Sequence, residues 1–364
     1  MRELTGIDLP GGSEFVDTLQ RVWERGDAVF PVDRRLPTSS QRALLERFGA
    51  SSVITEQGES HLGTGVPTEE GDALVVATSG SSGEPKGAVL THAAIAASAT
   101  ATSARLNVVA SDHWLACLPL AHIGGLSVIT RSIVNATRLT VLDGFDAEAV
   151  ARSDATLVSL VATALRRVDA ARFRAILLGG SRAPAERPSN SIMTYGMTET
   201  GSGVVYDGLP LDGVELRIVD DEIHVRCPML LRCYRDGTDP RIDGGWFPTG
   251  DLGSLDGDGR LRVAGRIGDV INTGGEKVWP EDVEAVLSTH PDVSDVAVTK
   301  RSDDEWGELV VANIVTSRPT LELDEIRDFA RALLPSWSLP RDIVLVDSIP
   351  RTALGKIRRS ELSS

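Results

Sequence analysis

Residues 78–92 read TSGSSGEPKGAVLTH and follow an apolar run at residues 73–77. The glycines of this stretch allow tight turns that bring backbone N–H groups close to an anion, and the hydroxyl side chains add donors. This composition predicts a phosphate-binding loop between a buried strand and an alanine-rich helix, a place where a flexible linker is not expected. The residues expected to bind phosphate are Thr78, Ser79, Gly80, Ser81, Ser82, Gly83 and the positively charged Lys86.

The loop differs from the Walker pattern, because no Gly-Lys-Ser/Thr sequence closes it at the required spacing. Four more segments follow along the chain: YGMTET at 195–200, TGDLG at 249–253, GRIGDVINTGG at 265–275 and PRTALGK at 350–356. In this order, the five segments resemble the adenylate-forming superfamily of acyl-CoA synthetases, peptide-synthetase adenylation domains and luciferases. The resemblance implies the adenylate-forming enzyme fold, with a large α/β N-terminal domain, a β-rich subdomain and a small mobile α+β C-terminal domain.

The composition limits the classes of partner. The chain has 364 residues, 41% hydrophobic and 24% charged, which is usual for a globular protein of two domains. Its net charge of −15 argues against binding nucleic acid or an anionic membrane surface, because both need concentrated Lys and Arg. No long apolar stretch and no signal-peptide pattern is present, so we expect a cytoplasmic protein without a membrane-inserted segment. The odd number of cysteines, Cys117, Cys227 and Cys233, fits a reducing compartment.

The sequence pattern changes along the chain. Between residues 72 and 180, apolar runs alternate with helix-like stretches such as 92–106, which predicts an α/β layer. These runs lie at 73–77, 114–118, 157–161 and 175–178. After residue 211, two β-rich runs around Asp220 and Asp221 and a DGDG turn at 256–259 predict a β-rich subdomain.

We expect residues 1–266 to form the N-terminal domain and residues 267–364 to form the mobile C-terminal domain. The elements expected in the second domain are helices at 280–288 and 324–334, and strands at 293–299, 309–315 and 343–346. By resemblance, the hinge is the residue two places after Arg266, which is Gly268 in this chain. The family commonly has Asp, Lys or Ser there, and here Asp269 stands one place later.

The resemblance implies a first half-reaction in which a carboxylate attacks the α-phosphorus of ATP, a step that depends on positioning and charge neutralisation. Glu199 is expected to bind Mg²⁺, and Thr198 to donate to the α-phosphate. Tyr195 is expected to stack on adenine, with a Gly-Gly-Ser strand end on the other side and a polar pair at the ribose or phosphate. The strand end is Gly179, Gly180 and Ser181, and the pair is Asp251 and Arg266. A surface acid is the alternative for Glu199, and a turn cap for Asp251.

The resemblance implies that Lys356 approaches the substrate carboxylate and the α-phosphate during this step, whereas an exposed tail lysine is the alternative. For the second half-reaction, the C-terminal domain is expected to rotate and to present Gly274 and Gly275 to the pantetheine thiol of coenzyme A. Lys277 is expected to assist coenzyme A binding. One active site would thus use ATP, Mg²⁺ and coenzyme A in two half-reactions.

A further stretch, LPLAHIGGLSVITR at 118–131, is expected to belong to the pocket for the acid. This stretch, together with SLVAT at 159–163 and LLGGS at 177–181, resembles the o-succinylbenzoate-CoA ligases of menaquinone synthesis, most of all short actinobacterial members. The substrate of that family is an aromatic dicarboxylate, which needs apolar walls and donors for the carboxylate that does not react. The expected contacts are His122, Gly124, Gly125, Arg131 and Ser159. From spacing alone, a histidine such as His122 is more often structural. A structural role is also the alternative for Arg131.

Other readings of the same motifs remain open. The chain fits a fatty or aryl acid-CoA ligase, an adenylating domain that loads a carrier protein, or a degenerate nucleotide-binding scaffold, although the retained charged residues of the motifs argue against the last. The chain is also shorter than usual for the superfamily, with the phosphate loop much closer to the N-terminus. Either a minimal scaffold closes the site or a neighbouring subunit covers it, and a homodimer is the expectation by analogy.

Overall fold

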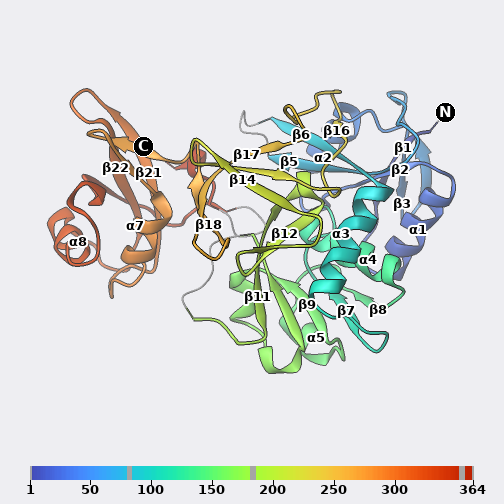
Figure 1. Ribbon diagram of the computed structural model, residues 1–364, viewed down its shortest axis with the longest axis horizontal. Helices are drawn as coiled ribbons and strands as arrows, with labels where there is room; N and C mark the ends of the chain where they lie inside the picture. Colours follow the sequence, from blue (N-terminus) through green and yellow to red (C-terminus); the bar gives the residue numbers. More distant parts are fainter. Residues whose placement is uncertain (1, 80–83, 181–185, 352–356, 363–364) are drawn as a thin grey trace. The chain divides into compact units, whose positions relative to one another are not determined.

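The computed structural model describes residues 2–79, 84–180, 186–351 and 357–362, with only the backbone of Ser79 (Figure 1). The chain divides into two compact units. The first comprises Met1–Arg217, His224–Pro248 and Gly257–Leu261, and the second comprises Ile218–Ile223, Thr249–Asp256 and Arg262–Ser364. The domain boundary at residue 266 stays a prediction. In the described ranges, every helix is too short or too polar to cross a membrane.

The first unit contains two seven-stranded sheets. The strand order of the first sheet is β16 (Cys233–Tyr234), β6 (Pro85–Thr91), β5 (Asp72–Ser79), β2 (Ala28–Pro31), β1 (Leu4–Asp8), β3 (Ser52–Thr55) and β4 (Gly58–His61). Strand β1 runs parallel to β2 and β3, whereas β6 pairs antiparallel with both β5 and β16. Helices α1 (Ser13–Glu24) and α2 (Thr38–Arg47) belong to the same N-terminal region. The residues that precede the first motif therefore form strands β1 to β4 of this sheet.

The predicted phosphate loop joins two antiparallel strands. Strands β5 and β6 pair with Thr78 opposite Lys86, and helix α3 (His92–Arg105) begins only after β6. The prediction of a strand, a loop and a helix in direct succession was therefore wrong. Residues 88–90 are apolar and fully buried, so they form an inner strand of the sheet instead of leading into the helix.

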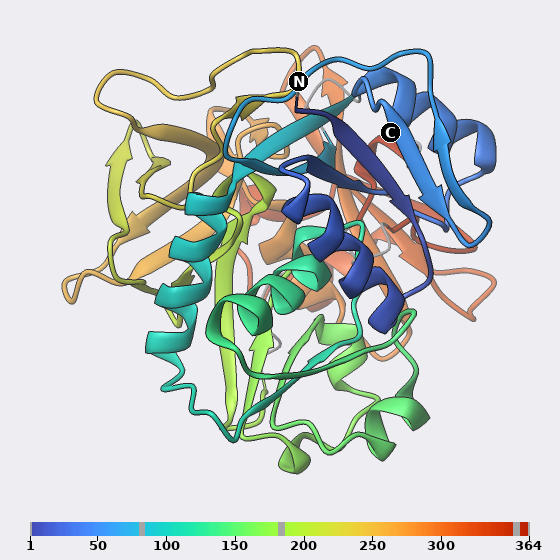
Figure 2. The ribbon, with the colours of Figure 1, turned by 90° about the vertical axis from the view of Figure 1, so that its right-hand side faces the viewer.

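The second sheet confirms the predicted α/β layer. Its order is β13 (Leu209–Pro210), β12 (Ser202–Tyr206), β11 (Ser191–Met197), β10 (Ala175–Leu178), β9 (Leu157–Leu160), β7 (His113–Ala116) and β8 (Arg138–Val141). The strands from β8 to β11 are parallel, and β12 and β13 are antiparallel additions. Helix α3 lies beside α4 (Ile123–Asn135) and contacts β6 of the first sheet and β12 of the second (Figures 1 and 2). The short helices α5 (Ala147–Arg152) and α6 (Ala162–Leu165) complete this layer.

A third sheet confirms the predicted β-rich region. Its order is β14 (Glu215–Val219), β15 (Glu222–Arg226), β17 (Phe247–Leu255) and β18 (Leu261–Arg266). Asp220 and Asp221 form the turn between β14 and β15, with φ angles of 51° and 68°. Aspartate tolerates this left-handed region better than most residues, which favours a tight hairpin at that point.

The C-terminal elements form a five-stranded sheet with two helices. The order is β20 (Glu276–Val278), β19 (Ile271–Thr273), β22 (Gly307–Val315) and β21 (Asp295–Asp303), with β23 (Asp342–Leu345) pairing with β22. Helix α7 (Pro280–Leu287), predicted at 280–288, starts with a proline and carries two acids in its first turn. Helix α8 (Leu323–Ala330) ends four residues before the predicted end at 334, and Leu333 in the turn that follows is 62% exposed.

Candidate active site

The described ends of the phosphate loop lie on β5 and β6. Thr78 is paired with Lys86 across the two strands, and Lys86 Nζ lies 4.8 Å from the ring centre of Tyr234. Four predicted ligands of the loop lie outside the described residues: Gly80, Ser81, Ser82 and Gly83. The two ends of the loop are thus placed, and its binding of phosphate stays a prediction.

Glu199, the predicted cation ligand, lies in the 3₁₀ turn η2 (Thr198–Thr200) between β11 and β12. The hydroxyl of Tyr234 donates to Glu199 Oε1 over 3.0 Å. The backbone N–H of Leu231 donates to the carbonyl of Glu199 over 2.7 Å. Thr198 is the first residue of the same turn, so the two predicted catalytic residues of this motif project from one short, hydrogen-bonded segment.

The predicted adenine site lies at the carboxyl end of β10, next to β11 of the second sheet. Gly179 and Gly180 directly follow β10, and Tyr195 lies on β11, the parallel neighbour of β10. A Cβ atom at Gly179 would lie 3.0 Å from Thr194 Oγ1, and Gly180 has a φ of 86° that favours glycine. Ser181 lies outside the described residues. The topology therefore brings the Gly-Gly strand end beside the strand of Tyr195, while the stacking on adenine stays a prediction.

Asp251 and Arg266 come together in the second unit, on β17 and β18. Arg266 Nε donates to Asp251 Oδ1 over 2.9 Å. Asp251 is 8% exposed, and its backbone N–H donates to Thr249 Oγ1 over 3.1 Å. The guanidinium of Arg266 therefore fixes the direction of one carboxylate oxygen of Asp251.

The predicted coenzyme A residues lie on the hairpin of β19 and β20, with Gly274 and Gly275 at its tip and Lys277 on β20. Gly274 and Gly275 have φ angles of 59° and 86°, and a Cβ atom at Gly274 would lie 2.9 Å from the Trp306 ring. Lys277 Nζ lies 3.3 Å from Asp221 Oδ2, an exposed ion pair that the sequence did not predict. At the predicted hinge, Gly268 has open space around its Cα, so no steric requirement explains a glycine there.

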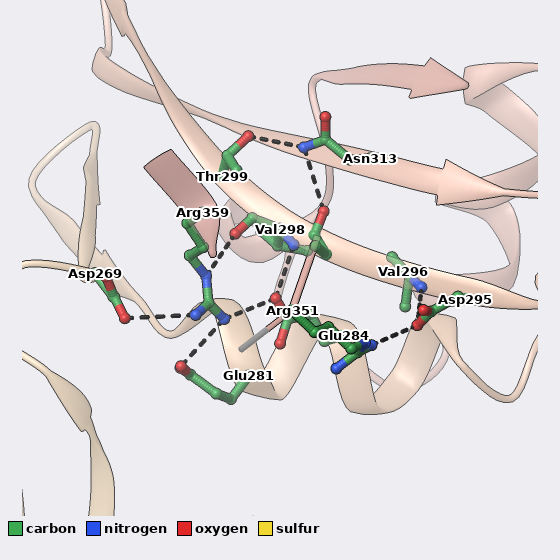
Figure 3. Close-up of polar contacts among 11 residues, drawn as sticks. Asp269, Glu281, Glu284, Asp295, Val296, Val298, Thr299, Asn313, Arg351 and Arg359 are labelled. Atoms are coloured by element: carbon green, nitrogen blue, oxygen red, sulfur yellow. Dashed lines mark hydrogen bonds and ion pairs between the residues drawn. The ribbon is translucent and has the colours of Figure 1, made fainter. Parts of the chain in front are cut away.

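Lys356, the predicted catalytic lysine, lies outside the described residues, but the chain on both sides of it is placed. Arg351 forms an antiparallel bridge with Ile357 and donates to Asp295 Oδ1 over 2.7 Å. Arg359 donates to Glu284 Oε1 over 2.7 Å and lies 3.2 Å from Glu281 Oε1 and 3.4 Å from Asp269 Oδ2 (Figure 3). Residues 351 and 357–359 are thus anchored to α7, β21 and the segment after the predicted hinge.

Arg131 is the most buried charged side chain of the predicted acid pocket. It is 2% exposed, donates to Ser159 Oγ over 3.4 Å and to the hydroxyl of Ser202, and lies over the Trp114 ring. Burial lowers the pKa of Arg131. In the described residues Nε of Arg131 has no partner and no carboxylate pairs with this guanidinium. The structure therefore joins the predicted residues Arg131 and Ser159 around a buried positive charge.

His122 precedes the same helix, α4, and contacts a different pair of residues. Arg35 Nη2 lies 2.7 Å from His122 Nε2, and the same imidazole nitrogen lies 3.7 Å from Asp33 Oδ2. Asp33 accepts from Arg35 over 2.7 and 2.6 Å. Burial raises the pKa of Asp33, but the hydrogen bonds from Arg35 outweigh that effect and hold the pKa below its ordinary value. Nothing in the described residues joins His122 to Arg131, so their common role stays a prediction.

The two glycines at the start of α4 differ in their surroundings. A Cβ atom at Gly125 would lie 2.4 Å from the carbonyl oxygen of Leu118 and 2.6 Å from that of Pro119. A Cβ atom at Gly124 would make only an ordinary contact of 3.6 Å with the Leu118 side chain. Packing alone therefore explains Gly125, whereas the predicted substrate contact remains the reason to expect glycine at 124.

Comparison with known proteins identifies the family. Residues 60–234 match the AMP-binding enzyme family, and residues 282–356 match the AMP-binding enzyme C-terminal domain. The chain is 40% identical over 356 residues to a protein of Mycobacterium tuberculosis named a probable 2-succinylbenzoate-CoA ligase, covering 88% of this chain and 92% of that protein. The chain belongs to the AMP-binding enzyme family. It is also 37% identical to the 2-succinylbenzoate-CoA ligase of Geobacillus kaustophilus, covering 80% of this chain and 68% of that protein.

Solved structures of the AMP-binding enzyme family agree with this assignment. The chain resembles o-succinylbenzoate CoA synthetase (MenE) from Bacillus subtilis in complex with the acyl-adenylate intermediate OSB-AMP, with a TM-score of 0.89 and 27% identity. That match covers 100% of this chain and 88% of the other. The same enzyme in complex with ATP and magnesium ion gives a TM-score of 0.87 at 27% identity, covering 99% of this chain and 89% of that chain. The adenylate-forming enzyme fold expected from the motifs is confirmed.

Several contacts in this AMP-binding enzyme were missed from the sequence because they join distant parts of the chain. The partners of predicted site residues that sequence reasoning did not find are Tyr234, Arg35, Asp33, Ser202 and Trp114. Tyr234 lies 35 positions from Glu199, and Arg35 lies 87 positions from His122. No local spacing links such residues, and the pairing of strands β6 and β16 helps to bring Tyr234 to the site.

The cysteines lack the properties of a catalytic thiol. Burial raises the pKa of Cys117 to about 12 and that of Cys227 to about 11. Burial also raises the pKa of Cys233. A nucleophilic cysteine needs a lowered pKa, so these thiols do not supply a covalent route in this AMP-binding enzyme.

Proposed function

We propose that this chain is an ATP-dependent 2-succinylbenzoate-CoA ligase of menaquinone biosynthesis, which forms an acyl-adenylate and then a thioester with coenzyme A. The observation that carries the proposal is the environment of Arg131, whose described hydrogen-bond partners are serine hydroxyls. A buried charge without an ionic partner is costly. The second carboxylate of a dicarboxylate such as 2-succinylbenzoate would compensate it. Relatives named for this substrate support the same conclusion.

In the proposed first half-reaction, an oxygen of the acid's carboxylate attacks the α-phosphorus of ATP and pyrophosphate leaves. Thr78 and Lys86, together with residues 79–83 of the loop, hold the β- and γ-phosphates. Thr198 donates to an α-phosphate oxygen as charge develops there. Lys356 brings a positive charge to the carboxylate and the α-phosphate. Because no covalent enzyme intermediate is needed, these groups act by position and charge.

Glu199 fits the carboxylate ligand that a magnesium ion needs. No cluster of three or more His, Cys, Asp or Glu residues that could hold a metal occurs in the described part of the chain. Mg²⁺ usually takes one or two protein carboxylates and completes its coordination with phosphate oxygens and water. When bound, the ion neutralises charge on the phosphates of ATP. Tyr234 holds Oε1 of Glu199, so Oε2 is the oxygen expected to bind the cation.

The nucleoside is proposed to bind through residues of three motifs. Tyr195 stacks on adenine, and the strand end formed by Gly179, Gly180 and Ser181 lies against the base. Asp251 accepts hydrogen bonds from the ribose hydroxyls, and Arg266 holds that carboxylate in place while reaching the ribose or phosphate. The 2.9 Å contact between Arg266 and Asp251 supports this arrangement, because it fixes the acceptor before the ligand binds.

The acid is proposed to bind beside α4 and β9. Arg131 and Ser159 bind the carboxylate that does not react, and His122 contacts the acid near Gly124 and Gly125. In the second half-reaction, residues 267–364 rotate about Gly268 as a domain distinct from residues 1–266. Gly274, Gly275 and Lys277 then bind coenzyme A, whose thiol attacks the acyl carbon and releases AMP.

We further propose that the enzyme works in the cytoplasm and as a homodimer. The three free cysteines support a reducing compartment. The chain spans 69% of the length of the 2-succinylbenzoate-CoA ligase of Bacillus cereus, and a second copy would cover surface that a longer chain covers itself. Light scattering after size-exclusion chromatography tests the dimer, and a monomer of 38.8 kDa at micromolar concentration would reject it.

An acid panel tests the proposed function. Pyrophosphate release from ATP should require 2-succinylbenzoate, and the analogue without its ring carboxylate should be used far less well. Pyrophosphate release with fatty or simple aryl acids, and none with 2-succinylbenzoate, would support adenylation but reject 2-succinylbenzoate as the substrate. Acyl transfer to a phosphopantetheinyl protein, with no transfer to free coenzyme A, would favour a carrier-loading enzyme.

A further inference from the structure

Tyr234 contacts two groups of the proposed nucleotide site at the same time. Its hydroxyl donates to Glu199 Oε1 over 3.0 Å, and its ring lies 4.8 Å from Lys86 Nζ. The residue is 8% exposed, and its contacts with the half-buried Glu199 and Lys86 are partly shielded from water. Neither motif sequence contains this residue, and it comes from the short strand β16.

The backbone around Tyr234 is bonded to both of the segments that its side chain touches. Leu231 N–H donates to the Glu199 carbonyl over 2.7 Å, which ties the segment to the turn η2. Arg232 N–H donates to the Val89 carbonyl over 2.9 Å, and Arg235 N–H to the Gly87 carbonyl over 2.7 Å. These bonds hold Tyr234 between strand β6, which carries Lys86, and the segment that carries Glu199. A residue anchored on both sides can fix the distance between two charged groups.

The chemistry of a phenol suits this position. The hydroxyl donates to one carboxylate oxygen without adding a charge, so Glu199 stays anionic and its other oxygen remains available to a cation. The aromatic face attracts the ammonium group of Lys86 without neutralising it, as a carboxylate would. Lys86 and Glu199 can therefore be held in place and still keep their full charge for a polyphosphate and its cation.

We infer that Tyr234 is a positioning residue of the adenylation site, which orients Glu199 through its hydroxyl and Lys86 through its ring. This role rests on the proposed function, in which Glu199 binds Mg²⁺ and Lys86 binds the β- and γ-phosphates. The two contacts are separable by substitution. Tyr234→Phe removes the hydroxyl and keeps the ring, whereas Tyr234→Leu removes both.

The test measures ATP affinity by isothermal titration calorimetry, with Mg²⁺ and with EDTA in its place. Tyr234→Phe should weaken binding of ATP about threefold to tenfold with Mg²⁺ and leave binding in EDTA unchanged, because only the Glu199 contact is lost. Tyr234→Leu should weaken binding under both conditions, because the Lys86 contact is lost as well. Tyr206→Phe is the matched control, since its buried hydroxyl bonds to Thr102 at 3.1 Å, away from both charged groups. It should bind ATP as the wild type does.

A double-mutant cycle shows whether Tyr234 acts through its partners. On a Glu199→Gln background, Tyr234→Phe should cause no further loss of affinity with Mg²⁺. Equal losses with Mg²⁺ and in EDTA, or a full loss on the Glu199→Gln background, would overturn the inference and leave Tyr234 a packing residue. If the wild type binds ATP with Mg²⁺ but fails the acid panel, the acid assignment fails and Tyr234 keeps its role. If the wild type does not bind ATP, both the proposed function and this role are rejected.

Discussion

At the residue scale, the contacts of Arg131 favour a binding role over a structural one. An arginine that stabilises the fold normally has a carboxylate partner, as the half-exposed Arg174 does with the buried Asp112 over 2.9 and 2.6 Å. The described partners of Arg131 are hydroxyls and an aromatic ring. Removing a buried charge that lacks an ionic partner need not destabilise a protein, whereas breaking a buried ion pair does.

Arg131→Met should therefore raise KM for 2-succinylbenzoate about tenfold to a hundredfold, the loss of roughly 1.5 to 3 kcal/mol for a hydrogen bond to a charged group. Its thermal midpoint should stay close to that of the wild type. Arg174→Met is the control and should show the reverse, with an unchanged KM and a lower midpoint. Steady-state kinetics and differential scanning calorimetry measure both, and a stable enzyme with an unchanged KM in Arg131→Met would remove this residue from the acid site.

Asp112 gives a pH dependence at the same scale. Burial raises its pKa, but hydrogen bonds from Arg174, the Val109 backbone and Thr156 outweigh that effect, so the pKa in the folded protein lies below the ordinary 3.8. A carboxylate with a lowered pKa contributes stability that is fully present above its unfolded pKa and is lost as pH falls through its folded pKa. Asp112→Asn should thus be less stable than the wild type at pH 7, and the difference should shrink below about pH 4. Urea denaturation at both pH values measures it, and a difference that does not change with pH would contradict the assignment.

At the scale of elements, the start of α4 shows what a local pattern can and cannot predict. The HIGGL sequence indicated space beside His122 for a ligand, but the structure shows that Gly125 is required by the carbonyl oxygens of Leu118 and Pro119. By contrast, β10 was predicted at 175–178 and is observed there, because a short apolar run that is buried is typical of an inner strand. Strand β6 was missed, because the pairing that buries it is non-local.

The two glycines of α4 give a matched pair of variants. Gly125→Ala should destabilise the protein by about 1 to 3 kcal/mol or more, because the new methyl group overlaps two backbone oxygens. Gly124→Ala should keep or increase stability by up to about 1 kcal/mol, since alanine favours a helix. If the acid lies against residue 124, Gly124→Ala should also raise KM for the acid. Urea denaturation and kinetics give both quantities, and a Gly125→Ala protein as stable as the wild type would contradict the packing argument.

Helix α7 and the residues around Arg359 form the other informative element (Figure 3). Glu284 is partly buried and accepts a hydrogen bond from the Arg359 guanidinium. Burial raises the pKa of Glu284, and the positive charge of Arg359 opposes that shift. Arg359→Met would leave Glu284 without its ionic partner, with only the Val298 backbone N–H donating to it, and should cost about 3 kcal/mol of local stability. Arg358→Met is the control, because the ion pair of Arg358 with Glu361 is half-exposed and worth about 1 kcal/mol or less. Hydrogen exchange should show lower protection in α7 and β21 only for Arg359→Met, and equal protection in both variants would reject the anchoring role.

At the scale of the whole molecule, the sequence predicted the family and its layered fold but not the way the N-terminus is used. The motifs begin near residue 78, yet β1 to β4 precede them and share a sheet with β5 and β6. The pairs Asp251–Arg266 and Arg131–Ser159 consist of residues that were both predicted for the site. The contacts of Tyr234 with Glu199 and of Arg35 with His122 could not be predicted, because contacts across strand pairs and between loops leave no periodic signal in one sequence.

The proposed two half-reactions make a prediction for the entire chain. Lys356→Ala should abolish formation of the acyl-adenylate and largely retain transfer from a supplied acyl-adenylate to coenzyme A, because the lysine serves only the first step. Gly274→Ala should have the opposite effect, since its φ of 59° and the nearby Trp306 ring leave no room for a methyl group at the hairpin tip. Single-turnover assays of each step measure the two rates. Equal loss of both steps in Lys356→Ala would contradict domain rotation about the hinge.

The most direct test of the central claim is mass spectrometry of the products formed from ATP, Mg²⁺ and 2-succinylbenzoate. Without coenzyme A, the wild type should accumulate the acyl-adenylate and release pyrophosphate, and addition of coenzyme A should convert the adenylate into the thioester and AMP. Absence of an adenylate with 2-succinylbenzoate, combined with one formed from a fatty or simple aryl acid, would contradict the assignment.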